Sequence, residues 1–167
     1  MSIQTKNRKR TRAICQAAII AATYTVLTYV TALFGLASGV IQLRLSEALC
    51  ALCIFTPAAI PGLTLGCLIS NLVTGCLPTD VLFGSLATLL GAAGGWLLRE
   101  RPYLAPIPTV LSNTVIVPFV LAYAYRVEEG LPFLFLTVGI GEILSAYVLG
   151  IALYLSLKKH SGKWFSL

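Results

Sequence analysis

Five residues with carboxylate or amide side chains stand inside or at the edges of apolar stretches of this sequence. Such side chains suit a binding site, because carboxylates accept hydrogen bonds and amides both donate and accept them. Gathered in one place, they would recognise a small molecule that is rich in donors or positively charged. The five are Glu47, Asn71, Asp80, Asn113 and Glu142.

Each of the five also has a structural interpretation. Asp80 follows Pro78-Thr79, and Glu47 follows Ser46, so both carboxylates could lie in the first turn of a helix and interact with its dipole. Asn71 and Asn113 could form hydrogen bonds between helices. Glu142 differs, because VGIGE carries it deep into an apolar segment, where an ionisable group is costly and usually marks a functional site.

Arg44 and Glu47 raise a related question, because the stretch QLRLSEAL spaces them three residues apart. Residues at this spacing share a helix face and could form an ion pair. An exposed pair of this kind contributes under about 1 kcal/mol, which is a weak reason to place both beside apolar segments. We therefore predict that this stretch forms the lip of a binding pocket, with Arg44 either gating the loop or pairing with Glu47.

Several kinds of chemistry have no support in the sequence. It lacks a phosphate-binding GxxxxGK[ST] loop, and its one histidine, His160, lies in a basic tail. The five cysteines are odd in number and dispersed, and the pair Cys50-x-x-Cys53 lacks the further ligands of a zinc site. We therefore predict no catalytic residues, no metal and no cofactor, and a chain that is not itself an enzyme.

The composition is that of a membrane protein. Hydrophobic residues make up 57% of the 167 residues and charged residues only 11%, whereas soluble domains are about a quarter charged. The mean hydropathy is +0.89. We predict a single all-α membrane domain over residues 1–167, with six transmembrane segments separated mainly by prolines and charges. The predicted segments cover residues 13–35, 46–56, 58–75, 80–98, 103–125 and 131–157.

The basic residues predict the orientation of these segments. An even number of segments places both termini on one side, together with the Arg99-Glu100-Arg101 loop. The clusters KNRKRTR and KKHSGK then fall on that same side, which the positive-inside rule identifies as cytoplasmic. The net charge of +6 belongs to these flanking clusters, so we expect the lipid bilayer and not nucleic acid as a partner. All five polar residues then lie in the middle or outer half of the bilayer.

The first segment carries rows of small residues at intervals of four. Small residues at this spacing allow helices to pack backbone to backbone in lipid. They could form a surface for a partner protein or pack inside the same bundle. The residues are Ala13, Ala17, Ala18, Ala21 and Ala22.

Four ordered motifs, RLSEAL, FTPAAIPGLTLGCLISNL, DVLFGSLATLLG and GIGEILSAYVLG, resemble the QueT family of queuosine-precursor transporters. These are substrate-binding S components of energy-coupling factor (ECF) transporters. The resemblance implies a six-helix bundle in the bacterial cell membrane that assembles with a transmembrane coupling subunit and two cytoplasmic ATPases. It also directs attention to a set of binding positions: Arg44, Ser46, Glu47, Asn71, Asp80, Asn113 and Glu142.

The chemistry of these positions fits a 7-deazaguanine ligand such as preQ1, preQ0 or queuine. One carboxylate, which we expect to be Glu142, would accept the adjacent N–H and amine of the guanine-like edge. A second, Glu47 or Asp80, would bind the aminomethyl cation of preQ1 through charge-assisted bonds. Phe83 and Phe135 could stack on the ring, or they could simply pack or face lipid.

Other functions remain open at this stage. The chain could be an S component for another vitamin or base, such as thiamine or riboflavin. It could be a small intramembrane enzyme that uses Glu47 and Glu142 as acid and base, although it lacks any nucleophile–histidine set. It could also be a structural membrane protein without a ligand, which would leave Glu142 unexplained.

Overall fold

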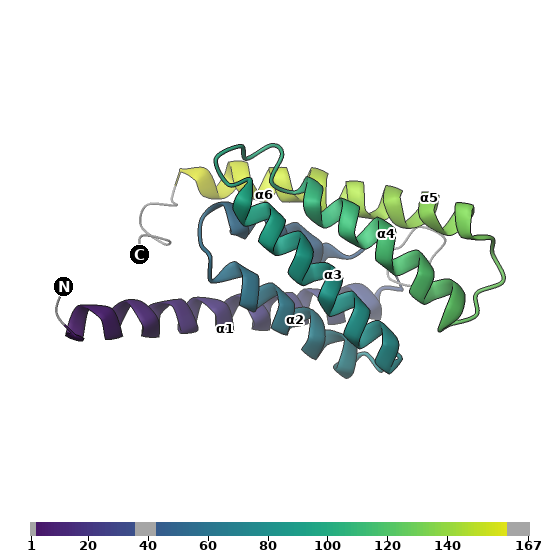
Figure 1. Ribbon diagram of the computed structural model, residues 1–167, viewed down its shortest axis with the longest axis horizontal. Coiled ribbons are helices and arrows are strands. Elements are labelled where there is room, and N and C mark those ends of the chain that lie inside the picture. Colours follow the sequence, from purple (N-terminus) through teal and green to yellow (C-terminus); the bar gives the residue numbers. More distant parts are fainter. Residues whose placement is uncertain (1–2, 36–42, 160–167) are drawn as a thin grey trace.

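The computed structural model describes residues 3–35 and 43–159, and these residues form helices and no strand (Figure 1). The all-α prediction is confirmed for this part of the chain. Helices are the expected result for long apolar runs, since a helix satisfies its own backbone groups without water. In chain order the elements are α1 (Ile3–Leu33), η1 (Leu45–Ile54), α2 (Ala59–Val73), α3 (Pro78–Leu97), α4 (Ile107–Tyr123), α5 (Leu131–Glu142), η2 (Ile143–Leu149) and α6 (Gly150–Lys158).

Three helical stretches within the described residues are long and apolar enough to cross a membrane: Asn7–Leu33, Pro78–Leu97 and Leu131–Lys158. The shorter apolar helices η1, α2 and α4 have 10, 15 and 17 residues. Each predicted segment overlaps one of these six stretches. The 3-10 helix η1 rises by about 2 Å per residue and so reaches ~20 Å, less than the ~30 Å hydrocarbon core. Six crossings therefore stay a prediction.

The predicted boundaries differ from the structure at α1, which begins at Ile3 and not at residue 13, and before α4. The segment expected to begin at residue 103 begins at Ile107, because residues 98–106 form a connection of successive turns. Pro102 and Pro106 lie in this connection, and neither can donate a backbone hydrogen bond to continue a helix. The predicted segment at 46–56 likewise ends early, at Ile54.

The helices form an elongated bundle with two distinct ends (Figure 1). The start of α1 and the end of α6 lie at one end, together with the connection between α3 and α4 that carries Arg99 and Arg101. The connection between α4 and α5, with Glu128 and Glu129, lies at the opposite end. The basic and acidic connections are thus separated along the bundle, as the charge pattern requires.

Close packing of α1 against α2 depends on two glycines. A Cβ atom at Gly62 would lie 2.9 Å from the Ala17 carbonyl oxygen, and one at Gly66 would lie 2.7 Å from Tyr24 Cβ. The two backbones approach so closely only because these side chains are missing. As a result Tyr24 is held inside the bundle, where its side chain is 2% exposed.

Two further glycines allow α3 to pack closely against α4. A Cβ atom at Gly91 would lie 2.7 Å from Thr109 Cα, and one at Gly94 would lie 2.5 Å from Pro108 Cβ. The main apolar core lies between the first helices and η1. It consists of Ile20, Tyr24, Leu49, Leu52, Cys53, Ala59, Leu63, Cys67 and Ala92.

The last stretch is a continuous rod made of α5, η2 and α6, and its middle part η2 is a π-helix. π-helical turns are rare and occur frequently at functional sites. Here the wider turns begin directly after Glu142 and face η1. Two contacts tie the elements together: the backbone N–H of Arg44 donates to Ser145 Oγ at 3.1 Å, and Cys50 Sγ donates to the Ala146 carbonyl at 3.5 Å.

Candidate functional site

A polar cavity of about 410 Å³ is lined by residues near the ends of α1, α2 and α4 and the start of α3. These ends of the helices lie away from the chain termini in Figure 1. Ligand pockets in proteins typically measure roughly 300–1,000 Å³, so this one suits a small heterocycle. Its walls come from α1, the start of η1, the α2–α3 connection and the end of α4. They consist of Thr28, Thr31, Ala32, Arg44, Asn71, Thr74, Cys76, Asp80, Leu121, Tyr125 and Val127.

Arg44 and Asp80 are the charged residues of this wall. Arg44 lies just before η1 and is half-buried, and Asp80 and Glu47 both lie close enough to attract its guanidinium group. Sequence reasoning left open whether Arg44 pairs with Glu47. The structure places both acids near Arg44, so it does not single out Glu47 as the partner.

Asp80 lies in the first turn of α3, and its carboxylate bonds to a residue outside that helix. Its Oδ2 atom accepts a hydrogen bond from the Tyr125 hydroxyl at 3.0 Å. Its Oδ1 atom is buried and has no hydrogen-bond partner among the described residues. Asn71 supports the same turn, since its Nδ2 atom donates to the Asp80 backbone carbonyl at 3.4 Å. The carboxylate is therefore bonded to the end of α4 through one oxygen, and its other oxygen has no donor in the described part of the chain.

A second polar group lies deeper in the bundle, around Glu47. This carboxylate is 2% exposed and accepts a hydrogen bond from the hydroxyl of Tyr24. The Asn113 amide of α4 lies near both Glu47 and Glu142, and the two acids lie close enough to repel each other when both are charged. Glu142 Oε2 is buried without a partner in the described part of the chain.

A hydrogen bond between Thr28 and Ser46 connects the cavity wall with the polar group around Glu47. The Thr28 hydroxyl donates to Ser46 Oγ at 2.8 Å, which ties the start of η1 to α1. Thr28 lines the cavity, while Ser46 is fully covered beside Glu47. Ser46 thus supports the wall of the site from behind and does not line the cavity.

The arrangement as a whole favours ligands that donate hydrogen bonds. The site contains one guanidinium group, that of Arg44, and three carboxyl groups, those of Glu47, Asp80 and Glu142. Two carboxylate oxygens, Asp80 Oδ1 and Glu142 Oε2, are buried without a partner. A buried acceptor that lacks a donor is destabilised, so a ligand with N–H groups or a positive charge would satisfy what the protein leaves unpaired.

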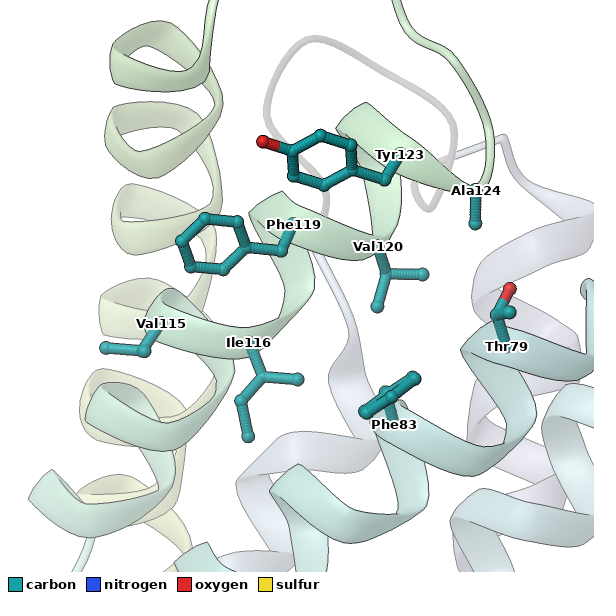
Figure 2. A pocket seen from close by; sticks show the side chains of 8 residues that line it. All are labelled: Thr79, Phe83, Val115, Ile116, Phe119, Val120, Tyr123 and Ala124. Atoms are coloured by element: carbon teal, nitrogen blue, oxygen red, sulfur yellow. The ribbon is translucent and has the colours of Figure 1, made fainter.

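The two predicted stacking residues lie away from the carboxylates. Phe83 is 44% exposed and lines a second cavity of about 460 Å³, formed by apolar residues of α3 and α4. Figure 2 shows Ile116 and Val120 of α4 on the side facing Phe83. Phe135 packs edge-on against Phe119, with ring centroids 5.5 Å apart. For both residues the structure favours the packing interpretation.

The alanine rows of α1 divide between two faces. Ala18 and Ala22 are exposed, and Ala13 and Ala17 are half-buried beside an apolar groove of about 540 Å³ that also includes Pro57 and Pro61. Ala21 is 7% exposed and packs against Gly66 of α2. The prediction of a partner contact is corrected for Ala21, because α2 already covers it.

Sequence reasoning missed the tyrosines and threonines of the site. Tyr24, Thr28 and Thr31 follow one another at intervals of four and three along α1, which places them on one helix face. A polar stripe on an otherwise apolar helix could have indicated that these three residues face a polar site. Tyr125 had no such signal, because it reaches Asp80 across 45 positions of sequence.

Comparisons with known proteins identify the family of the chain. The family model described as QueT transporter matches residues 14–159. The chain is 37% identical over 94 residues to the queuosine precursor transporter QueT of Lactococcus lactis subsp. cremoris (strain MG1363). That alignment covers 56% of this chain and 55% of the relative, about half the length of each. No solved structure matches the chain.

The matched region runs from α1 to the end of α6 and contains every charged residue of the site. The apolar helices and the family match together identify a membrane transport protein. The chain belongs to the QueT transporter family.

Proposed function

We propose that this chain is the substrate-binding S component of an ECF-type importer that takes up a queuosine precursor, a 7-deazaguanine base. The observation that carries the proposal is the polar cavity, whose wall contains the buried and unpaired Oδ1 atom of Asp80. A second unpaired oxygen, Glu142 Oε2, is buried in the polar group deeper in the bundle. The QueT family match and the name of the Lactococcus relative support the substrate class.

The ligand chemistry complements this site. The guanine-like edge offers a ring N–H beside an exocyclic amine, and Glu142 is the acid with a buried, unpartnered oxygen next to Asn113. Asn71 and Asn113 would bind the remaining edges, because amides both donate and accept. An aminomethyl cation would find Asp80 in the cavity wall and Glu47 behind it, and charge-assisted bonds of this kind are roughly twice as strong as neutral ones.

The membrane arrangement follows from the same proposal. All six helical stretches would lie in the bacterial cell membrane, with both termini cytoplasmic and the polar cavity near the outer surface. The chain would supply binding, and a transmembrane coupling subunit with two cytoplasmic ATPases would supply the energy. The exposed alanines Ala18 and Ala22, beside the groove that includes Ala13 and Ala17, provide a face on which the coupling subunit would pack.

Calorimetric titration of the purified protein in detergent tests the proposal. The ligands are preQ1, preQ0, queuine, guanine, thiamine and riboflavin, each measured with the native chain and with Glu142→Gln. We expect one deazaguanine to bind tightly, and the variant to weaken it about 100-fold because a charge-assisted bond is lost. Glu128→Gln is the matched control, since Glu128 is exposed in the α4–α5 connection.

The outcomes separate the alternatives clearly. Tight binding of thiamine or riboflavin in place of the deazaguanines would make this an S component for a different vitamin. A folded protein that binds none of the six ligands would contradict the proposal. Equal losses in Glu142→Gln and Glu128→Gln would show that Glu142 has no special part in the site.

A further inference from the structure

Tyr125 occupies an unusual position for an aromatic residue beyond the end of a helix. Its hydroxyl makes two hydrogen bonds, accepting from the Leu77 backbone N–H at 3.2 Å and donating to Asp80 Oδ2 at 3.0 Å. These partners lie on either side of the α3 start at Pro78. One phenol therefore connects the end of α4 to both the α2–α3 connection and the first turn of α3.

The backbone around Tyr125 is itself well defined. The N–H of Tyr125 donates to the Val120 carbonyl, and that of Val127 donates to the Leu121 carbonyl, each at 3.2 Å. Arg126 between them has a φ of 52°, in the left-handed region that non-glycine residues rarely adopt. The chain thus turns sharply after α4 and brings Tyr125 into the cavity wall.

The effect of these contacts falls on Asp80. A carboxylate in the first turn of a helix ordinarily interacts with the free N–H groups there, but the hydrogen bond that Asp80 accepts comes from Tyr125 beyond α4. Tyr125 holds one of its oxygens, and the other, Oδ1, stays buried without a donor in the described part of the chain. Gly84, one turn later, keeps this space open, because a Cβ there would lie 3.3 Å from Oδ1.

We propose that Tyr125 is a positioning residue that holds Asp80 so that Oδ1 accepts one hydrogen bond from the bound ligand. The inference rests on the proposed function, since the ligand is the deazaguanine named there. It assigns the two carboxylate oxygens different tasks. Oδ2 fixes the orientation of the side chain, and Oδ1 contacts the ligand through a single donor rather than a pair.

A double-mutant cycle tests this assignment with calorimetry, using whichever deazaguanine binds the native chain most tightly. Tyr125→Phe keeps the ring and removes both hydrogen bonds, and we expect it to weaken binding about tenfold, as one neutral hydrogen bond would. Asp80→Ala should weaken binding more. Because Tyr125 acts through Asp80, adding Tyr125→Phe to Asp80→Ala should cause no further loss. Losses that multiply, or an unchanged affinity in Tyr125→Phe, would overturn the proposal.

Cys76 provides a second readout that needs no ligand. It lines the cavity next to Leu77 and is partly exposed, whereas Cys50, Cys53 and Cys67 are buried. In a Cys15→Ser background, which removes the exposed cysteine of α1, a water-soluble maleimide should therefore report on Cys76. We expect labelling to be several-fold faster in Tyr125→Phe, because the α2–α3 connection loses its bond to the phenol. Unchanged labelling would contradict the positioning role.

Tyr123→Phe is the matched control for both measurements. Tyr123 lies two residues earlier, is largely exposed and stacks on Phe119 outside the polar cavity, so we expect no change. If no deazaguanine binds the native chain, the proposed function fails and the labelling experiment still decides the role of Tyr125. Faster labelling would then support Tyr125 as the positioning residue of a site for another ligand, and unchanged labelling would overturn it.

Discussion

The helices α3 and α4 each contribute to two cavities of similar size and opposite character. One, of about 410 Å³, contains Asp80 of α3 and includes Tyr125 just beyond α4. The other, of about 460 Å³, contains the neighbouring Thr79 and Phe83 of α3, together with apolar residues of α4 (Figure 2). Consecutive residues on the same helix therefore face different surroundings.

The difference shows that volume alone does not identify the binding site. The apolar cavity is slightly larger, but it offers a ligand little to recognise beyond its shape, and several of its aromatic walls are exposed. In a membrane such a surface suits lipid chains. The polar cavity has charged groups, unpaired acceptors and residues from widely separated parts of the chain, which together can distinguish one small molecule from another.

The largest effect is expected at Asn113, on the polar side of α4. Asn113→Leu keeps the approximate size of the side chain but removes the amide that lies near both Glu47 and Glu142. Loss of partners for buried acceptors costs about 3 kcal/mol, so unfolding in detergent should occur at a lower temperature. We expect ligand affinity to fall about 100-fold, which corresponds to ~2.7 kcal/mol.

The matched substitution on the apolar side of α4 is Val115→Leu, two residues away. Val115 is exposed and lines the apolar cavity, so this change should leave both the melting temperature and the affinity nearly unaltered. Equal effects of the two substitutions would mean that the two faces of α4 do not differ in function.

A smaller effect is expected from a methyl group at Gly84. Its Cβ would lie 3.1 Å from Asn71 Nδ2 and 3.3 Å from Asp80 Oδ1, closer than side chains normally pack. Both polar groups must shift, and we expect Gly84→Ala to weaken binding about tenfold, or ~1.4 kcal/mol. Calorimetric titration measures this directly.

Gly139→Ala on α5 separates this local effect from the general effect of replacing glycine in a helix. A Cβ at Gly139 would meet Thr114 Cγ2 at 3.4 Å, an ordinary contact. Alanine also favours helix by up to about 1 kcal/mol over glycine. Native affinity in Gly139→Ala, with reduced affinity in Gly84→Ala, is the expected result, and the reverse order would contradict it.

Much of the fold could be predicted from hydropathy alone. The six predicted apolar segments overlap the helical stretches. A long apolar run has few alternatives to a helix, because a helix satisfies its own backbone groups without water. The acids Glu47, Asp80 and Glu142 could also be predicted as candidate site residues, because an ionisable residue in an apolar segment is costly and usually functional. These predictions needed only the local composition around each residue.

The remaining features depend on contacts between distant parts of the chain. Tyr125 looks like an ordinary aromatic residue near a membrane surface, and only the fold brings its hydroxyl to Asp80. The π-helical turns of η2 and the 3-10 turns of η1 occur where these two elements pack together. The apolar sequence of each element does not distinguish these turns from an ordinary α-helix. In the sequence Phe83 lies close to Asp80, which suggests that its ring stacks on a ligand bound there. In the structure Phe83 and Asp80 line different cavities.

The smallest expected effect therefore provides the most direct test of the comparison. Phe83→Leu removes an aromatic ring directly before Gly84 and three residues after Asp80, but on the apolar side of α3. If ligand specificity belongs to the polar cavity, affinity should change by less than about twofold, or ~0.4 kcal/mol. If the Phe83 ring stacks on a bound base, its loss should weaken binding by about tenfold or more. Titration of Phe83→Leu beside Gly84→Ala decides which side of α3 the ligand occupies.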